Sequence, residues 1–279
     1  MTTDLSPAND LRAVTSQQQQ TWSQGDFHEI ARLNVGMAEA MGDEADLRAG
    51  EHVLDVACGS GTAALVAARR YCRVVGIDYV PSLLDRARTR ADAEGLDADF
   101  LEADAQDLPF DDDSFDAVLS VYGVQFAPDQ HRAARELVRV TRPGGRIVVA
   151  GPRPHGWSGE FFAAHARHSP PPPGLDSPLR WGTEDGLADL FGSAATRIVS
   201  EPRPAFQYWH STAHAVEVFW RWFGPTIRAA EALDDAGRRS LRTDLEQVFQ
   251  RYNRAIDGTP VVENSYLLTV ITVGEPALR

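Results

Sequence analysis

The chain has 279 residues, 43% of them hydrophobic, which is enough for one large α/β domain with a packed core. Its 40 acidic and 27 basic residues give a formal charge of −13, so we expect no nucleic-acid partner, because such a surface repels phosphate. Cys58 and Cys72 lack the spacing of metal ligands or of a disulfide framework. No apolar stretch resembles a secretion signal or approaches the ~20 residues of a membrane span. We therefore expect a cytoplasmic protein with no metal site and no membrane partner.

The N-terminal part of the chain has the spacing of helices. Residues 1–20 are expected to be loosely ordered at first and then helical, and apolar side chains recur at helical intervals between Trp22 and Met41. The tract SQQQQ at residues 16–20 is interpreted as the solvated face of a helix.

The next hundred residues alternate between the patterns of strands and helices. Strand-like runs lie within residues 48–59, 73–80, 98–110, 115–123 and 146–152, and helical patterns lie within residues 62–71, 81–95 and 129–145. The last of these helices is expected to stop at Pro143 and Gly144. Five strands that alternate with helices predict a doubly wound α/β fold around a mostly parallel sheet.

After Gly151 the composition changes. Residues 152–182 are rich in Pro, Gly and Ser, so we expect a surface excursion that continues neither a helix nor a central strand. Thr183 is a plausible N-cap for a short helix. Residues 212–256 are mostly helical in pattern, and a last strand is expected within residues 263–273. The chain is therefore one sheet-based domain with a C-terminal helical elaboration.

A glycine turn follows the first strand, in the stretch HVLDVACGSGTAALVAARR at residues 52–70. Gly59 and Gly61 allow positive φ angles and the close approach of a ligand, and the following helix offers free N–H groups. The spacing also matches the G-x-G-x-x-A pattern of dinucleotide sites, which is a weak signal by itself. The turn alone therefore leaves the ligand open.

Asp55, near the carboxyl end of that first strand, argues against a dinucleotide. A carboxylate there would repel a pyrophosphate by about 4 kcal/mol at ~4 Å and an effective dielectric constant of about 20. The same carboxylate favours a cationic ligand, and an ammonium group with a sulfonium centre is the chemistry of S-adenosylmethionine. A nicotinamide-dependent oxidoreductase is further disfavoured because the chain has no lysine, and so no Tyr-x-x-x-Lys pair.

Two later acids fit the same ligand. Asp78 ends the second predicted strand, at the usual position of an acid that accepts hydrogen bonds from ribose hydroxyls. Nicotinamide cofactors use such an acid as well, so Asp78 alone does not separate the two. Asp104 follows the third strand and could accept a hydrogen bond from an adenine amino group, while Ala105 could offer its backbone N–H to the ring.

Four motifs together resemble those of a known family. VLDVACGSG, GIDYVPSLLDRAR, EADAQDLPFDDDSFDAVLS and RPGGRIVVAG occur in the order and spacing of class I S-adenosylmethionine-dependent methyltransferases. The branch that they resemble is the small-molecule branch similar to the ubiquinone and menaquinone biosynthesis enzymes. The resemblance implies a seven-stranded Rossmann-like sheet whose final hairpin is reversed.

The resemblance also implies which residues hold the cofactor. They are Trp22, Phe27, Asp55, Ala57, Gly59, Gly61, Asp78, Tyr79, Val80, Asp104, Ala105 and Val121. Asp55 and the glycine turn would hold the methionine end, and Asp78 would hold the ribose. Asp104 would contact the adenine, which Tyr79 and Val80 would line.

The implied division of the chain has a lid and one large domain. Residues 1–45 form an N-terminal helical lid, which would carry Trp22 and Phe27. Residues 46–279 form the methyltransferase domain. Its cofactor-binding core is expected at residues 50–151, and its substrate-capping elements are expected at residues 152–182 and 212–256.

The expected reaction moves a methyl group to an O, N or C atom of a small-molecule acceptor and leaves S-adenosylhomocysteine. Val121 and Tyr122 would face the transferable methyl, and His155 and Tyr122 are the catalytic candidates, because a base is needed only if the acceptor loses a proton. The alternatives are a catalytically diverged protein or cyclase on the same fold, an RNA or protein methyltransferase, and an NAD(P)-dependent oxidoreductase. We expect a monomer or a homodimer.

Overall fold

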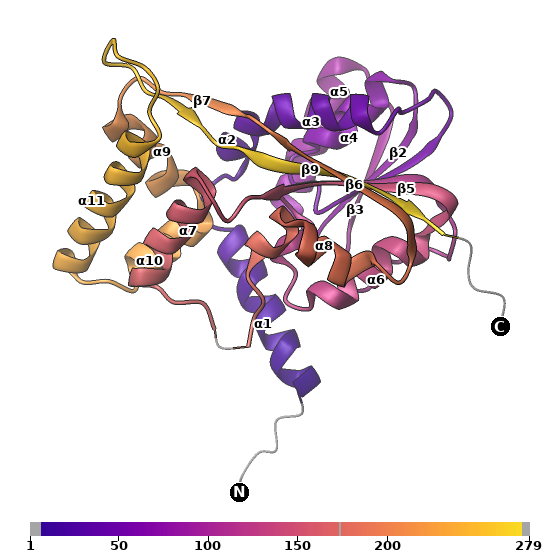
Figure 1. The fold of residues 1–279 in the computed structure, drawn as a ribbon, viewed down its shortest axis with the longest axis horizontal. Coiled ribbons are helices and arrows are strands. Elements are labelled where there is room, and N and C mark those ends of the chain that lie inside the picture. Colours follow the sequence, from indigo (N-terminus) through magenta and orange to yellow (C-terminus); the bar gives the residue numbers. More distant parts are fainter. Residues whose placement is uncertain (1–6, 173, 275–279) are drawn as a thin grey trace, which may run out of the picture.

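The computed structural model describes residues 7–172 and 174–274, and its centre is a seven-stranded sheet (Figure 1). The strands are β1 (His52–Val56), β2 (Arg73–Asp78), β3 (Ala98–Glu102), β4 (Phe115–Val121), β5 (Thr141–Pro152), β6 (Ala195–Arg203) and β9 (Tyr266–Val273). Their order is β3-β2-β1-β4-β5-β9-β6. The pairs from β3 to β5 are parallel, whereas β9 runs antiparallel to β5 and to β6. The expected doubly wound, mostly parallel seven-stranded fold is therefore confirmed.

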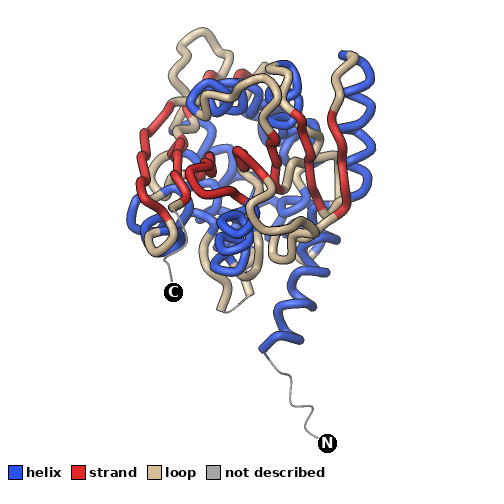
Figure 2. The backbone as a smooth tube through the Cα atoms, turned by 90° about the vertical axis from the view of Figure 1, so that its right-hand side faces the viewer, coloured by secondary structure: helices blue, strands red, loops and turns tan. Residues whose placement is uncertain are grey.

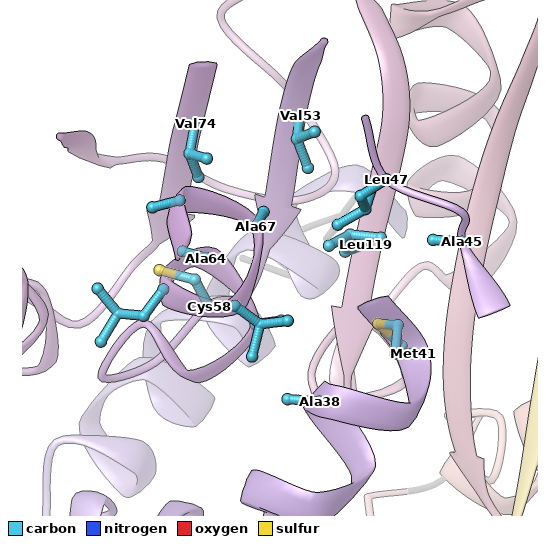
Figure 3. Packing of buried hydrophobic residues seen from close by; sticks show 14 of the residues in the cluster. Ala38, Met41, Ala45, Leu47, Val53, Cys58, Ala64, Ala67, Val74 and Leu119 are labelled. Atoms are coloured by element: carbon cyan, nitrogen blue, oxygen red, sulfur yellow. The ribbon is translucent and has the colours of Figure 1, made fainter. Parts of the chain in front are cut away.

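Helices cover both faces of this sheet. On one face lie α3 (Val35–Glu44), α4 (Thr62–Arg69) and α5 (Pro81–Glu94), and on the other lie η2 (Val124–Phe126), α6 (Gln130–Val140), η3 (Pro178–Gly182) and α8 (Glu184–Phe191). Each set buries its apolar side chains against the sheet in its own cluster. Figure 3 shows side chains of the first cluster, among them Met41, Ala67 and Leu119. Thr183 caps α8 as expected, because its hydroxyl accepts a hydrogen bond from the Gly186 N–H.

A third hydrophobic cluster lies to one side of the sheet. Its side chains come from two groups of elements. We call the first group the cap; it consists of α7 (Trp157–His168), α9 (Thr212–Trp222), α10 (Gly224–Glu231), α11 (Asp235–Arg251) and the ribbon of β7 (Phe206–Tyr208) and β8 (Val261–Glu263). We call the second group the lid; it consists of α1 (Pro7–Trp22), α2 (His28–Ala31) and η1 (Arg32–Asn34). Figure 2 shows the first turns of α1 projecting beyond the body of the molecule. Residues 1–6 of the expected lid lie outside the described residues.

The expected lid of residues 1–45 divides between two packing environments. Residues 35–45 pack on the sheet, because Met37, Met41 and Ala45 are buried in its first cluster. Only the segment up to Asn34 packs with the cap. No helix in the two described ranges is both long and apolar enough to cross a membrane.

Two expectations about helices are wrong. Residues 152–182 contain α7, although no helix was expected there. The prolines of this segment lie before and after the helix, so the high proline content of the whole segment conceals the helical stretch in its middle. Its apolar residues Trp157, Phe161 and Ala164 have helical spacing and are buried. The helix expected to reach Pro143 ends at Val140 instead, because a residue before proline avoids the α region and Thr141 already pairs with β4.

Candidate functional site

The glycine turn joins β1 to α4 and is held by the acids of two neighbouring strands. Gly59 and Gly61 have φ angles of +54° and +78°, in the left-handed region that favours glycine. The Asp78 carboxylate accepts a hydrogen bond of 2.9 Å from the Gly59 N–H. The Asp55 carboxylate accepts one of 2.8 Å from the Ala64 N–H in the first turn of α4. The turn therefore lies between two carboxylates at the carboxyl edge of the sheet.

Both acids are nearly inaccessible to solvent. Asp55 is 1% exposed and Asp78 is 5% exposed. Burial raises the pKa of Asp55 to about 7, opposed by the bond from Ala64 and increased by the charge of Asp78. Burial also raises the pKa of Asp78 to about 6, opposed by backbone N–H groups that include those of Val80 and Gly59. A cation bound between them would stabilise the ionised forms, so the site is suited to a positively charged ligand.

Two cavities adjoin the turn and together form what we call the cleft. Their empty volumes, which include space open to solvent, are about 670 and 360 Å³. Phe27, Ala57, Gly59 and Tyr122 line both cavities. The four shared lining residues join the two cavities into one continuous cleft beside the turn.

The ends of the cleft differ in the acids that line them. Asp78 and Asp104 line the larger cavity, which we call the first cavity, whereas Asp55 lines the second. Asp104 is held by Gln106, whose side-chain amide donates to both of its carboxylate oxygens at 3.0 and 3.1 Å. The cleft therefore carries an acid from the end of β1, another from β2 and a third from the loop after β3.

The structure brings most of the expected residues to this cleft. Those that line it are Trp22, Phe27, Asp55, Ala57, Gly59, Asp78, Tyr79, Asp104, Ala105, Val121 and Tyr122. Gly61 and Val80 do not line it. Gly61 precedes α4, and an added Cβ would lie 3.0 Å from that of Ala87, so this glycine serves packing. Val80 is buried and precedes α5, where its N–H bonds Asp78 at 2.9 Å.

The two catalytic candidates have very different surroundings. His155 is exposed and lines neither cavity. Tyr122 lies where the cavities meet, with a φ angle of +47° that is uncommon for a non-glycine residue. Its hydroxyl is buried without a hydrogen-bond partner among the described residues. Burial raises the pKa of Tyr122, opposed by nearby Ser158 and Asn264, and the hydroxyl stays protonated at neutral pH.

Aromatic side chains of the lid close the cleft. The Trp22 ring lies 5.3 Å from that of Phe27, 4.9 Å from that of Phe126 and 5.6 Å from that of Phe223, measured between ring centroids. Phe126 follows β4, and Phe223 belongs to the cap. The expected capping segments, residues 152–182 and 212–256, contribute no lining residue to either cavity. Phe223, which belongs to the second of these segments, instead packs against Trp22, which lines the first cavity.

Polar contacts attach the lid to the sheet side. The His28 Nδ1 atom lies 3.0 Å from the Ser60 hydroxyl in the glycine turn. Burial lowers the pKa of His28, and the charges of Arg90 and Arg86 lower it further. Asp26 pairs with Arg86 of α5 at 2.6 Å. The lid thus lies against the turn and against α5.

Several lining residues were not anticipated from the sequence. They are chiefly the polar residues Thr15, Gln18, Asn34, Thr62 and Gln106 and the aromatic Phe126. A usable signal exists for the first two, because Thr15, Gln18 and Trp22 have the spacing of one helix face. For the others the sequence offers no local pattern.

Comparison with known proteins places this cleft in context. Residues 54–149 match the family model described as a methyltransferase domain. The uncharacterized protein Rv1405c of Mycobacterium tuberculosis is 35% identical over 276 residues, which cover 96% of this chain and 98% of that protein. The demethylmenaquinone methyltransferase of Thermus thermophilus is 46% identical over 104 residues, or 37% of this chain and 47% of that enzyme.

A solved structure shares the architecture. The YcgJ protein of Bacillus subtilis superposes with a TM-score of 0.59 at 19% identity, and the match covers 86% of this chain and 98% of that one. At this identity the likeness concerns the fold. Together with the domain match and the sequence relatives, it gives the assignment: the chain belongs to the class I S-adenosylmethionine-dependent methyltransferases of the small-molecule kind and is an enzyme of that family.

Proposed function

We propose that the cleft binds S-adenosylmethionine and that the enzyme transfers its methyl group to a small molecule without negative charge, leaving S-adenosylhomocysteine. The observation that carries the proposal is the charge of the lining. It contains the three carboxylates Asp55, Asp78 and Asp104, and no Arg or His is among its described residues. Such a lining favours a ligand of net positive charge and disfavours a pyrophosphate or a phosphate.

The assignment of the cofactor follows the positions of the three acids. Asp55 would hold the ammonium group, Asp78 the ribose hydroxyls, and Asp104 with the Ala105 backbone the adenine. The raised pKa values of Asp55 and Asp78 support this fit, because a bound cation and hydroxyl donors would offset the cost of burying both charges. When bound, S-adenosylmethionine supplies an activated methyl group.

The protein's own contribution is positioning and the exclusion of water. Tyr122 lines both cavities and Val121 lines the second, so an acceptor that reaches these residues would face the methyl end. The rings of Trp22 and Phe126 close the first cavity from the lid and from the end of β4. Alignment of the two reacting atoms in a site that excludes water can supply much of the acceleration of a methyl transfer.

Proton removal is not assigned to a residue of the cleft. His155 lies outside it, and the Tyr122 hydroxyl is protonated and buried. We therefore propose an acceptor whose attacking O, N or C atom needs no strong protein base. Turnover that rises with pH and falls when His155 is replaced by Ala would contradict this point.

Calorimetric titration with S-adenosylmethionine and with NADH tests the cofactor. Binding of the first alone is expected, and binding of NADH alone would overturn the proposal. Transfer of labelled methyl groups to a panel of small molecules without negative charge, with tRNA and protein as parallel acceptors, tests the acceptor class. Label that enters only tRNA or protein would contradict a small-molecule acceptor, and cofactor binding without any transfer would favour a diverged protein.

A further inference from the structure

The glutamine tract at residues 16–20 is divided between solvent and the cleft. Ser16, Gln17 and Gln20 are exposed, as expected for a solvated face. Gln18 is partly buried and lines the first cavity. The tract therefore belongs to a helix with two different sides, and one of its glutamines reaches the proposed cofactor site.

The cleft face of α1 follows helical spacing. Thr15, Gln18 and Trp22 are three, four and seven residues apart, so they lie along one stripe, and all three line the first cavity. Trp22 is at the aromatic end of that stripe. Gln18 and Thr15 lie one and two turns before it, toward the acids.

Two side chains of α1 attach the helix to the loops that carry those acids. The Gln19 amide donates a hydrogen bond to the backbone oxygen of Tyr79, next to Asp78. The Thr15 hydroxyl accepts one of 3.2 Å from the Gln106 amide, which also holds Asp104. These contacts place Gln18 beside the end of the cleft that carries Asp78 and Asp104.

Gln18 has an unused acceptor at this place. Its Oε1 atom is buried and has no hydrogen-bond partner among the described residues. A buried amide oxygen without a partner costs free energy, which a ligand donor in the cavity would recover. Gln18 therefore brings an unpaired acceptor to the wall of the first cavity, which Asp78 and Asp104 also line.

We propose that Gln18 is a cofactor-binding residue that accepts a hydrogen bond from the adenosine half of S-adenosylmethionine. The proposal rests on the proposed function, because it assumes that this cofactor occupies the cleft. Adenosine offers donors in its amino group and its ribose hydroxyls, and these groups belong at the end of the cleft where Gln18 lies. The lid would then recognise the cofactor as well as cover it.

The test compares Gln18→Leu with Gln17→Leu, its exposed neighbour in the same tract. Calorimetry measures binding of S-adenosylhomocysteine and of 5′-methylthioadenosine, which keeps the adenosine but lacks the amino acid end. Gln18→Leu should weaken both ligands about five- to tenfold, as expected for one lost hydrogen bond, and Gln17→Leu should weaken neither. An equal loss for the two ligands would assign the contact to the adenosine.

Other outcomes separate this inference from the proposed function. If the wild-type protein binds neither S-adenosylmethionine nor S-adenosylhomocysteine, the proposed function itself fails. If the wild type binds and Gln18→Leu binds equally well, only the role of Gln18 is overturned. A loss confined to S-adenosylhomocysteine would also overturn it, because the contact would then involve the amino acid end.

Hydrogen exchange on the unmodified protein provides a measurement that does not depend on the folding of a variant. S-adenosylhomocysteine should slow amide exchange in peptides from residues 13–22 as well as in the glycine turn. Slower exchange in the turn with no change in α1 would contradict a direct contact between the helix and the cofactor.

Discussion

The two sides of the cleft are built in different ways. The sheet side takes Asp55, Asp78 and Asp104 from the ends of neighbouring strands, all within a contiguous segment of the chain. The lid-and-cap side brings together Trp22 from near the N-terminus and Phe223 from the C-terminal half. The acids that we propose to hold the cofactor are thus local in sequence, whereas closure of the site is not. This difference teaches that one fold can keep its cofactor while its cover varies.

The lid packs more intimately with the cap than with the sheet. A Cβ atom on Gly224 would lie 1.9 Å from the Thr21 backbone oxygen, and one on Gly25 would lie 2.7 Å from that of Trp222. Toward the sheet, the lid makes polar contacts such as the pair of Asp26 and Arg86. Lid and cap therefore share one cluster, and the cleft lies between that cluster and the sheet.

Phe249→Ala should have the largest effect on stability. It tests whether the sheet side and the lid-and-cap side unfold as separate cooperative units. Phe249 is fully buried in the third cluster, with ring centroids of Trp157 and Phe219 at 5.4 and 5.6 Å. Its removal should lower the free energy of unfolding by about 3–5 kcal/mol, measured by chemical denaturation. Hydrogen exchange should rise in the cap and lid before it rises in β1, β4 and β5. A uniform rise would indicate one cooperative unit.

Gly224→Ala should disturb the contact between lid and cap. The added methyl meets the Thr21 backbone, so overpacking should lower the free energy of unfolding by about 1–3 kcal/mol. Gly36→Ala is the matched control, because its Cβ would meet nothing within 4 Å in the helix α3. That control should stabilise the protein by up to about 1 kcal/mol. Equal melting temperatures for the two variants would contradict the close contact.

Asp78→Ala probes the sheet side without touching the lid. We expect a loss of about 1–3 kcal/mol in the binding of S-adenosylmethionine, because hydrogen bonds to a charged group are lost. Asp99→Ala, which removes an exposed acid on neighbouring β3, is the control and should bind normally. Calorimetry measures both. Unchanged affinity in Asp78→Ala would remove this residue from the ribose role.

The pH dependence of cofactor binding tests whether the two buried acids ionise when the cofactor binds. The folded protein holds the protons of Asp55 and Asp78 up to about pH 7 and 6, above the ordinary value of 3.8. These groups therefore make the ligand-free protein less stable as the pH rises through that window. A cationic cofactor prefers the ionised acids, so its affinity should rise from about pH 5.5 to 7, by at most about tenfold per unit and per group.

Titration calorimetry at several pH values in that range measures this trend. Asp78→Asn should reduce the slope, because one of the two titrating acids is gone. An affinity that stays level from pH 5.5 to 7 in the wild-type protein would contradict ionisation of these carboxylates on binding.

Parts of the site could be read from local patterns, and parts could not. Asp55, Asp78 and Asp104 were predictable because each follows or ends a strand, and parallel strands end at one edge of the sheet. The proposed role of Gln18 was not predictable, because a glutamine tract is typical of a solvated helix face until the helix is placed against Gln106 and Tyr79. His155 was expected near the site because it follows β5, yet it is exposed and lines neither cavity.

The sequence by itself determined the doubly wound fold, the glycine turn and the acids beside it. These features depend on periodicity and on the order of the strands, which are local properties of the chain. Only the tertiary structure decided that α7 exists, that the lid ends near Asn34, and that Trp22, Phe126 and Phe223 meet over the cleft. These features depend on burial and on contacts between distant segments, which no local pattern records. The raised pKa values of Asp55 and Asp78 also depend on the tertiary structure, since burial by the whole fold causes them.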